Sequence, residues 1–248
     1  MFEFNWTGIL GIEEVVQNGI SSYYSIEWHS NTIITFDDKF KVKRRVKGEF
    51  DLMDSLKYVE NSFYIIAPSV FYKTNLHFRR IDQFKDPYFR PLRFDYDIIN
   101  SKFYIIILSN YLRNYIKVFD KSCSFLYEFG MANNFSPIVI AVYNNNLYIA
   151  PHSQNQMIAI TSNTGQVIEY FNKNINDPCR RYGFSINVDS LGYVAIGCRD
   201  PAIIVLYDSK GNYVTKTKLT FNEPIREIKI MSNNRLAIVD ESSVFIFN

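Results

Sequence analysis

The chain has 248 residues, of which 47% are hydrophobic and 21% are charged. This balance excludes an intrinsically disordered or collagen-like chain, and no run of residues approaches the roughly 20 apolar positions that a membrane-spanning helix needs. The formal net charge of +2 is too small for a protein that coats nucleic acid with its whole surface.

Short strands are the structure that the sequence predicts almost throughout. The 21 Phe and 18 Tyr far outnumber the 10 Gly and 8 Pro, and aromatic residues suit a pleated, half-buried surface. Helical periodicity is nearly absent. Instead, apolar or alternating runs of about five to eight residues are separated by Asn, Asp, Ser and Gly. The predicted fold class is therefore all-β.

The runs repeat in groups along the chain. The first group surrounds the dipeptide Asn18-Gly19, which is a strong hairpin signal. The strands expected in the first three groups are, in chain order, 23–28, 32–36 and 40–46; 56–59, 63–67 and 76–81; and 92–99, 103–108, 115–119 and 124–129. Those expected in the last three are 138–143, 147–150, 156–161 and 166–171; 185–189, 193–197, 202–207 and 212–219; and 225–231, 235–240 and 244–247.

The spacing of the turns indicates a β-propeller. A first series of turns recurs at Asn18, Asn61, Asn100, Asn145, Ser190 and Asn233, with a period of about 40 to 45 residues. A second series at Asp37, Asp120 and Asp208 is spaced by about two such periods. Four strands per period predict a single-domain, six-bladed propeller over residues 1–248. Its expected blades are 10–48, 52–85, 91–130, 136–172, 183–220, and 224–248 together with 2–6.

The two ends of the chain are expected to meet. The last group stops after three strands, and the run Phe2–Trp6 precedes the first group without a partner there. An open ring would leave two exposed sheet edges, which favour aggregation. The run Phe2–Trp6 is therefore predicted to be the outermost strand of the last blade, and the alternative is a frayed N-terminal arm.

The fifth group resembles an NHL repeat. Asp189 and Gly192 match the first turn of that repeat, and Tyr193 begins its aromatic-Val strand. The remaining matching positions are Asp200, Val205, Tyr207, Asp208 and Gly211. Residues 146–165 and 100–122 are similar to it more loosely, whereas the first two groups resemble it poorly and the Asn-His pair common at the corner is absent. The resemblance implies a propeller that binds proteins or single-stranded RNA, although related six-bladed propellers are enzymes.

One face of the predicted propeller carries the candidate binding residues. The loops between blades and the loops between second and third strands lie on this face, and binding residues concentrate in such loops. They include Asp86–Arg90 and 177–182. The alternative is that their residues are ordinary solvated loop residues. The candidate binding residues are Arg90, Arg93, Tyr111, Arg180, Arg181, Tyr182 and Arg199.

The basic run Lys39–Lys47 has two interpretations. Clustered Lys and Arg could neutralise phosphates. The run is, however, predicted to form the outermost strand of the first blade, where alternating Lys protects an exposed edge from pairing with another chain. The second interpretation is favoured.

The sequence indicates no metal centre, cofactor or catalytic group. The three histidines, His29, His77 and His152, are not predicted to converge on one ion. A lactonase-like set of Glu13, Asn187 and Asp240 around the central channel has no surrounding motif to support it. No G-x-S-x-G nucleophile and no glycine-rich phosphate loop occurs.

The aromatic pairs and the cysteines have simpler readings. One ring of each of the pairs Tyr23-Tyr24 and Phe103-Tyr104 is expected to pack between adjacent blades rather than to stack on bases. Cys123, Cys179 and Cys198 are an odd number without a C-x-x-C motif. Together with the lack of a secretory signal, they favour a reducing, intracellular compartment.

The function that the sequence favours is non-enzymatic. A binding or scaffolding propeller would present its Arg- and Tyr-bearing loop face to a partner protein. The alternative is a propeller of the NHL type that binds single-stranded RNA, and the third possibility is a metal-dependent lyase or lactonase acting in the central channel. No membrane association is expected, and the sequence does not indicate an oligomeric state.

Overall fold

The computed structural model describes residues 2–5, 11–27, 31–48, 53–109, 114–130, 137–151, 158–161, 164–171, 184–198, 202–219, 225–231, 235–240 and 243–247. These residues form 24 β-strands. None of them belongs to a helix that could cross a membrane.

The described strands form six sheets of four antiparallel strands, called blades below. The first three blades are β2 (Glu13–Gln17), β3 (Ile20–Ile26), β4 (Thr32–Phe36) and β5 (Val42–Lys47); β6 (Ser55–Val59), β7 (Ser62–Ala67), β8 (Val70–Thr74) and β9 (Arg80–Lys85); and β10 (Pro91–Asp97), β11 (Lys102–Ile107), β12 (Tyr115–Phe119) and β13 (Phe125–Gly130). The last three are β14 (Pro137–Tyr143), β15 (Asn146–Pro151), β16 (Ile158–Thr161) and β17 (Val167–Phe171); β18 (Phe184–Val188), β19 (Val194–Cys198), β20 (Ile203–Tyr207) and β21 (Tyr213–Lys218); and β22 (Glu227–Ile230), β23 (Leu236–Val239), β24 (Ser243–Phe247) and β1 (Phe2–Asn5).

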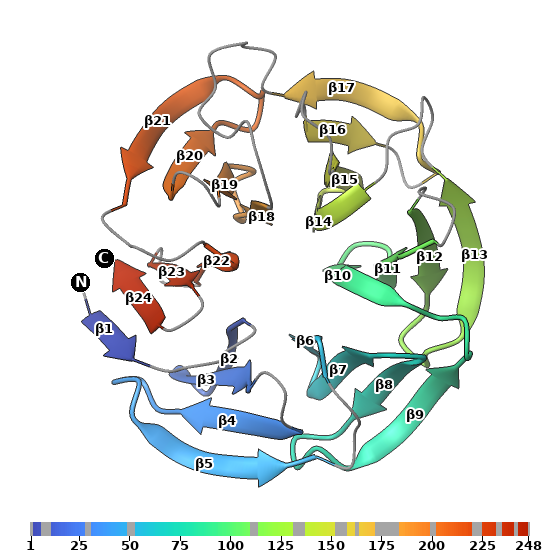
Figure 1. Ribbon diagram of the computed structural model, residues 1–248, viewed down its shortest axis with the longest axis vertical. Coiled ribbons are helices and arrows are strands. Elements are labelled where there is room, and N and C mark those ends of the chain that lie inside the picture. Colours follow the sequence, from blue (N-terminus) through green and yellow to red (C-terminus); the bar gives the residue numbers. More distant parts are fainter. Residues whose placement is uncertain are drawn as a thin grey trace.

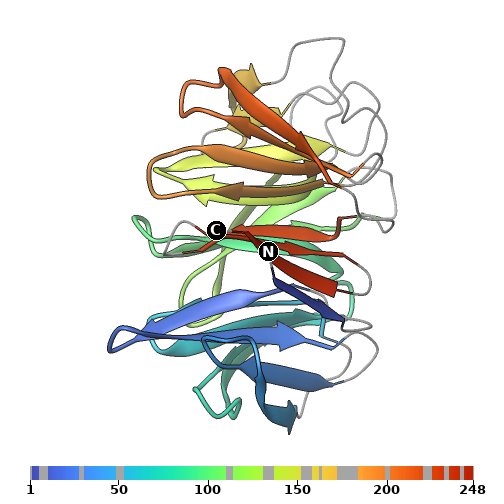
Figure 2. The same cartoon turned by 90° about the vertical axis from the view of Figure 1, so that its left-hand side faces the viewer.

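The blades are arranged around a central axis, with β2, β6, β10, β14, β18 and β22 innermost (Figure 1). Figure 2 shows the ring from its edge, with hairpin turns along one side. The predicted propeller of four-stranded antiparallel blades is confirmed. The predicted pairing of the N-terminal strand is confirmed as well, since β1 pairs with β24 in a register that aligns Phe2 with Ile246. Trp6 lies outside the described residues.

A side-chain turn recurs between the third and fourth strands of the blades. Asp37 Oδ1 accepts hydrogen bonds from the backbone N–H groups of Lys39 and Lys41, at 2.9 and 2.8 Å. Asp120 and Asp208 accept equivalent hydrogen bonds from the backbone N–H groups two and four residues after them. This confirms the second series of turns. The backbone hydrogen bonds lower the pKa of Asp37, with a smaller contribution from nearby lysines.

This turn corrects two predicted strands. The expected strand 76–81 is mostly the turn between β8 and β9, because Asn75 Oδ1 accepts hydrogen bonds from His77 N and Arg79 N. Phe78 occupies the third position after Asn75 with φ of 58°, and its ring is buried. Phe40 takes the equivalent position with φ of 57°, so β5 begins at Val42 rather than at Phe40. A buried aromatic residue in a turn resembles a strand residue in the sequence.

The hydrophobic core is divided among the blade junctions. Phe103 packs with Tyr64 and Phe71 of the second blade, at ring-centroid distances of 4.2 and 5.3 Å. The next residue, Tyr104, packs in the opposite direction with Ile140 and other residues of the fourth blade. A cluster containing Tyr23, Phe36, Val239 and Ile246 joins the first and last blades. The aromatic pairs therefore pack between blades, as expected, and both rings of Phe103-Tyr104 do so, one at each junction.

The basic run follows the outer rim of the first blade. β5 is the outermost strand of that blade, as predicted, and Lys43, Arg45 and Lys47 are exposed along it. Side chains of one sign at alternate positions disfavour the approach of a second sheet edge. Whether this strand also meets phosphates stays a prediction.

The cysteines differ from the sequence-based expectation. Cys123 is a free, buried thiol whose pKa is raised by burial. Cys198, at the end of β19, is disulfide-bonded. The cysteines therefore do not support the expected reducing compartment, because an odd number does not prevent two of them from pairing.

Candidate functional site: the central channel and the loop face

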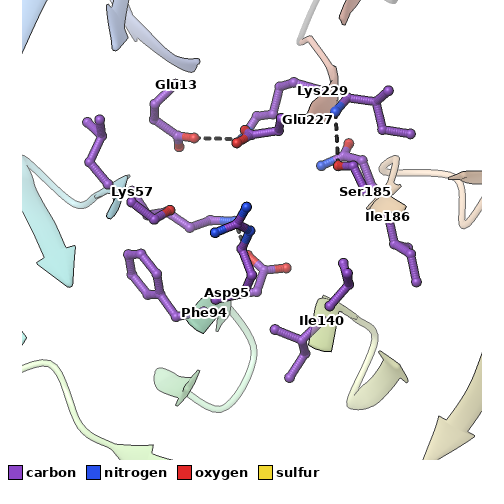
Figure 3. A pocket seen from close by; sticks show the side chains of 15 residues that line it. Glu13, Lys57, Phe94, Asp95, Ile140, Ser185, Ile186, Glu227 and Lys229 are labelled. Carbon is purple, nitrogen blue, oxygen red and sulfur yellow. Dashed lines mark hydrogen bonds and ion pairs between the residues drawn. The ribbon is translucent and has the colours of Figure 1, made fainter. Parts of the chain in front are cut away.

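A cavity of about 70 Å³ lies on the axis and is lined by residues from all six innermost strands. Polar side chains of these strands line this cavity, together with a few apolar ones. Figure 3 shows Glu13, Glu227 and Lys229 on one side of the channel, with Lys57 and Asp95 facing them. The charged residues of the wall are Glu13, Lys57, Arg93, Asp95, Glu227 and Lys229.

Two ion pairs neutralise four of these six charges. Lys229 Nζ donates a hydrogen bond to Glu13 Oε2 at 2.7 Å, which connects the last blade to the first. Lys57 Nζ donates to Asp95 Oδ1 and so connects the second blade to the third. All four side chains are mostly buried. Removing one partner would leave a poorly solvated charge, so each pair constrains the ring.

Polar side chains of the channel wall also accept hydrogen bonds from the backbone of the next innermost strand. Asp95 Oδ2 accepts from Val142 N at 2.7 Å. Asn187 Oδ1 accepts from Ile230 N at 3.0 Å. Further bonds of this kind are Ser185 Oγ with Ile228 N at 2.9 Å and Glu13 Oε1 with Tyr58 N at 3.3 Å. The Glu227 carboxylate accepts a hydrogen bond from the backbone of Ile12, which directly precedes β2. These contacts satisfy edge N–H groups that no neighbouring strand reaches.

Glu227 has the most perturbed acidic group in the channel wall. Burial raises its pKa to about 7, and the nearby Glu13 carboxylate acts in the same direction. The positive charges of Arg93 and Lys229 oppose the rise without cancelling it. At neutral pH, Glu227 is therefore ionised only in part.

Lys57 is a basic group whose pKa is shifted by the same cause, burial, in the opposite direction. Burial and the charge of Lys229 lower its pKa, whereas the negative charges of Glu13 and Glu227 oppose this shift.

Arg93 differs from the other two cations of the channel. It lies in the innermost strand β10 and lines the cavity, so its predicted place in the loop face was wrong. The reason is that the innermost strand begins at Pro91, so Arg93 belongs to the channel wall and not to the loop before it. Its Nη1 donates to the carbonyl oxygen of Leu92 at 2.9 Å. Within the described residues no carboxylate lies within the 4.0 Å of an ion pair, although Arg93 acts electrostatically on Glu227 and Asp54.

The structure brings together two of the three residues considered for a lactonase-like site. Glu13 and Asn187 both line the channel. Asp240 instead is buried near the β23–β24 turn, where its Oδ1 accepts a hydrogen bond from Ser243 N at 2.6 Å. His77 is exposed in the β8–β9 turn, and His29 and His152 lie outside the described residues. No group of three metal-ligating side chains occurs in the part of the chain that the structure describes.

The loop between β9 and β10 is the best-described part of the predicted binding face. Phe89 is fully buried against Phe84 and Phe119, at ring-centroid distances of 5.4 and 6.0 Å. Asp86 Oδ1 accepts a hydrogen bond from Tyr88 N at 2.8 Å. Ser69 in the β7–β8 turn pairs with the loop through its backbone, since Ser69 N donates to Phe89 O at 2.8 Å and Asp86 N donates to Ser69 O at 3.0 Å.

This anchored loop presents Tyr88 to solvent, and the residue is 85% exposed. Arg90 is exposed two residues later, and its carbonyl oxygen accepts a hydrogen bond from the backbone N–H of Leu108, whose side chain is also exposed. We call Tyr88, Arg90 and Leu108 the Tyr88 patch. Sequence reasoning selected Arg90 in this loop but missed Tyr88. The remaining candidates, Tyr111, Arg180, Arg181, Tyr182 and Arg199, lie outside the described residues.

Comparisons with known proteins support the fold alone. No family model matches the chain, and no curated protein does. Among solved structures, a streptogramin B lyase superposes with a TM-score of 0.71 at 12% identity, covering 100% of this chain and 87% of the other. Virginiamycin B lyase from Staphylococcus aureus gives 0.70 at 13% identity, with coverages of 96% and 81%. The WD40 propeller of Doa1 gives 0.69 at 11% identity, with coverages of 99% and 94%. The chain is thus similar in fold to β-propellers of differing function, and the NHL resemblance stays an expectation.

Proposed function

We propose that this protein is a non-enzymatic, six-bladed binding propeller that presents its loop face to a partner protein. The observation that carries the proposal is the Tyr88 patch. A tyrosine that is 85% exposed on an anchored loop offers a large contact area at little entropic cost on binding. Tyr and Arg are the residue types that most often dominate the binding energy of protein interfaces.

The dimensions of the channel argue against the alternative of an enzyme acting there. A cavity of about 70 Å³ is well below the 300 Å³ or more of typical sites for organic ligands. Two of its carboxylates are already held in ion pairs and accept backbone hydrogen bonds. These contacts favour a structural role for Glu13 and Asp95.

Site-specific photocrosslinking tests the proposal. A photoreactive phenylalanine analogue replaces Tyr88 in one variant and Tyr213 in the control, because Tyr213 is also exposed but lies on the outermost strand β21. Irradiation in extracts of the source cells is expected to give one discrete, protease-sensitive adduct from position 88 and none from position 213. A nuclease-sensitive adduct would favour the RNA-binding alternative. Equal labelling from both positions, or none from position 88, would contradict a protein partner at this patch.

A further inference from the structure

The ion pairs of the central channel leave one of its positive charges without a carboxylate in contact. Lys57 and Lys229 are each in contact with one carboxylate, whereas Arg93 is in contact with none among the described residues. Glu227 is the remaining acid of the wall, and it comes from the blade opposite that of Arg93. An arginine that lines a small cavity without an ion pair has N–H donors available to a negatively charged guest.

Glu227 supplies only part of the missing negative charge. Its carboxylate accepts a hydrogen bond from the Ile12 backbone and lies closely against Gly11, away from a direct contact with Arg93. Burial keeps it partly protonated near neutral pH. The wall therefore holds three cations against two fully paired acids and one partly ionised acid.

We propose that the central channel binds a small monovalent anion, with Arg93 as its main ligand. A halide or a small planar oxyanion such as nitrate or formate is the class of guest that fits. A volume of about 70 Å³ holds a few water-sized groups and is too small for most organic acids. A single negative charge matches the excess positive charge of the wall. The second charge of a divalent anion would be repelled by the carboxylates of Glu13 and Asp95.

The other elements around the cavity are compatible with such a guest. Ser55 and Asn187 offer hydroxyl and amide donors, and the fourth blade contributes apolar side chains of Val139 and Ile140. The titratable groups that face Glu227 are Glu13 from β2, Lys57 from β6, Arg93 and Asp95 from β10, and Lys229 on its own strand. Affinity is therefore expected to fall as pH rises through about 7 and Glu227 ionises.

Bromide is the probe for the test, because it scatters anomalously and substitutes for other small monovalent anions. A crystal soaked in bromide should show an anomalous peak in the channel beside the Arg93 guanidinium. In solution, the Tm in sodium bromide should exceed the Tm in sodium gluconate of equal ionic strength by several degrees, once bromide reaches about 100 times its Kd. Gluconate is too large for the cavity.

Two variants separate this site from general salt effects. In Arg93→Gln the bromide-dependent rise in Tm should disappear, whereas Arg79→Gln, which removes an exposed arginine of the β8–β9 turn, should keep it. Arg93→Lys should retain a weaker rise and provides a second test if the glutamine variant does not fold. The proposal is overturned if the channel shows no bromide peak. It is also overturned if the wild-type Tm is the same in both salts, or if Arg93→Gln keeps the full rise.

Discussion

Replacing Glu227 with glutamine should stabilise the protein in alkaline solution. In the folded protein the pKa of this carboxyl is about 7, against its ordinary value of 4.5. A pKa difference of one corresponds to about 1.4 kcal/mol, so ionising Glu227 within the fold costs roughly 3 kcal/mol relative to the unfolded chain. Because the side chain keeps some contact with solvent in the channel, we expect about 2 kcal/mol of this to be measured.

The sign of the effect depends on pH. Below about pH 4.5 the carboxyl is protonated in both states and the variant should match the wild type. As pH rises from about 4.5 to about 7, the wild type loses stability because the unfolded chain releases the proton while the folded carboxyl still holds it, and the loss is complete above pH 7. Glutamine keeps a carbonyl oxygen that can accept the hydrogen bond from the Ile12 backbone and carries no charge.

Urea denaturation at pH 5 and at pH 8.5 measures the difference, with the two m-values compared for consistency. The matched control is Glu60→Gln, because Glu60 forms an exposed ion pair with Lys121 at 2.5 Å and should change stability by less than about 1 kcal/mol. A Glu227→Gln variant that is equally or less stable than the wild type at pH 8.5, or a difference that does not change with pH, would contradict the raised pKa of Glu227.

Two further predictions concern the closure of the ring and the anchored loop. The double variant Glu3→Pro with Phe4→Pro should lower the free energy of unfolding by about 1 to 3 kcal/mol. Alternate residues of β1 donate their backbone N–H to β24, so one of these two neighbours is a donor, and proline has no N–H to donate. The corresponding alanine pair, which keeps both N–H groups, is its control in thermal unfolding, and equal stability of the two pairs would contradict the pairing. Phe89→Ala should cost about 3 to 5 kcal/mol in urea denaturation, since the ring is fully buried, and a loss below about 1 kcal/mol would show that Phe89 does not anchor the loop.

Much of the fold can be predicted from the sequence because local turn residues mark the hairpins of each blade. The turn at Asn18-Gly19 and the Asp residues at 37, 120 and 208 mark hairpins whose geometry depends on a few neighbouring residues. Position 75 was missed because asparagine followed by leucine and phenylalanine reads as a strand. There the burial of Phe78 compensates for its positive φ, and neither property is visible without the tertiary packing.

The site was less accessible to sequence reasoning. Glu13 and Asn187 were considered for the channel without a supporting motif, and Lys57, Asp95, Glu227 and Lys229 were not considered. These residues come from separate blades, and their pairing depends on which way each innermost strand directs its alternate side chains. A register shift of one residue would direct each of these side chains into the junction between two blades instead of into the channel. Tyr88 was missed for a related reason, since only the burial of Phe89 shows which of two adjacent rings faces solvent.

The pairing of β1 with β24 has a consequence for the order of folding. Every other strand pairing in the described part of the chain joins consecutive strands, whereas this one aligns residue 2 with residue 246. Bringing such distant segments together costs about 5 kcal/mol of chain entropy if nothing in between is yet ordered. Blades that assemble first shorten the effective loop and lower this barrier. We therefore expect individual hairpins to form early and the joining of the two ends to be the final, slowest step.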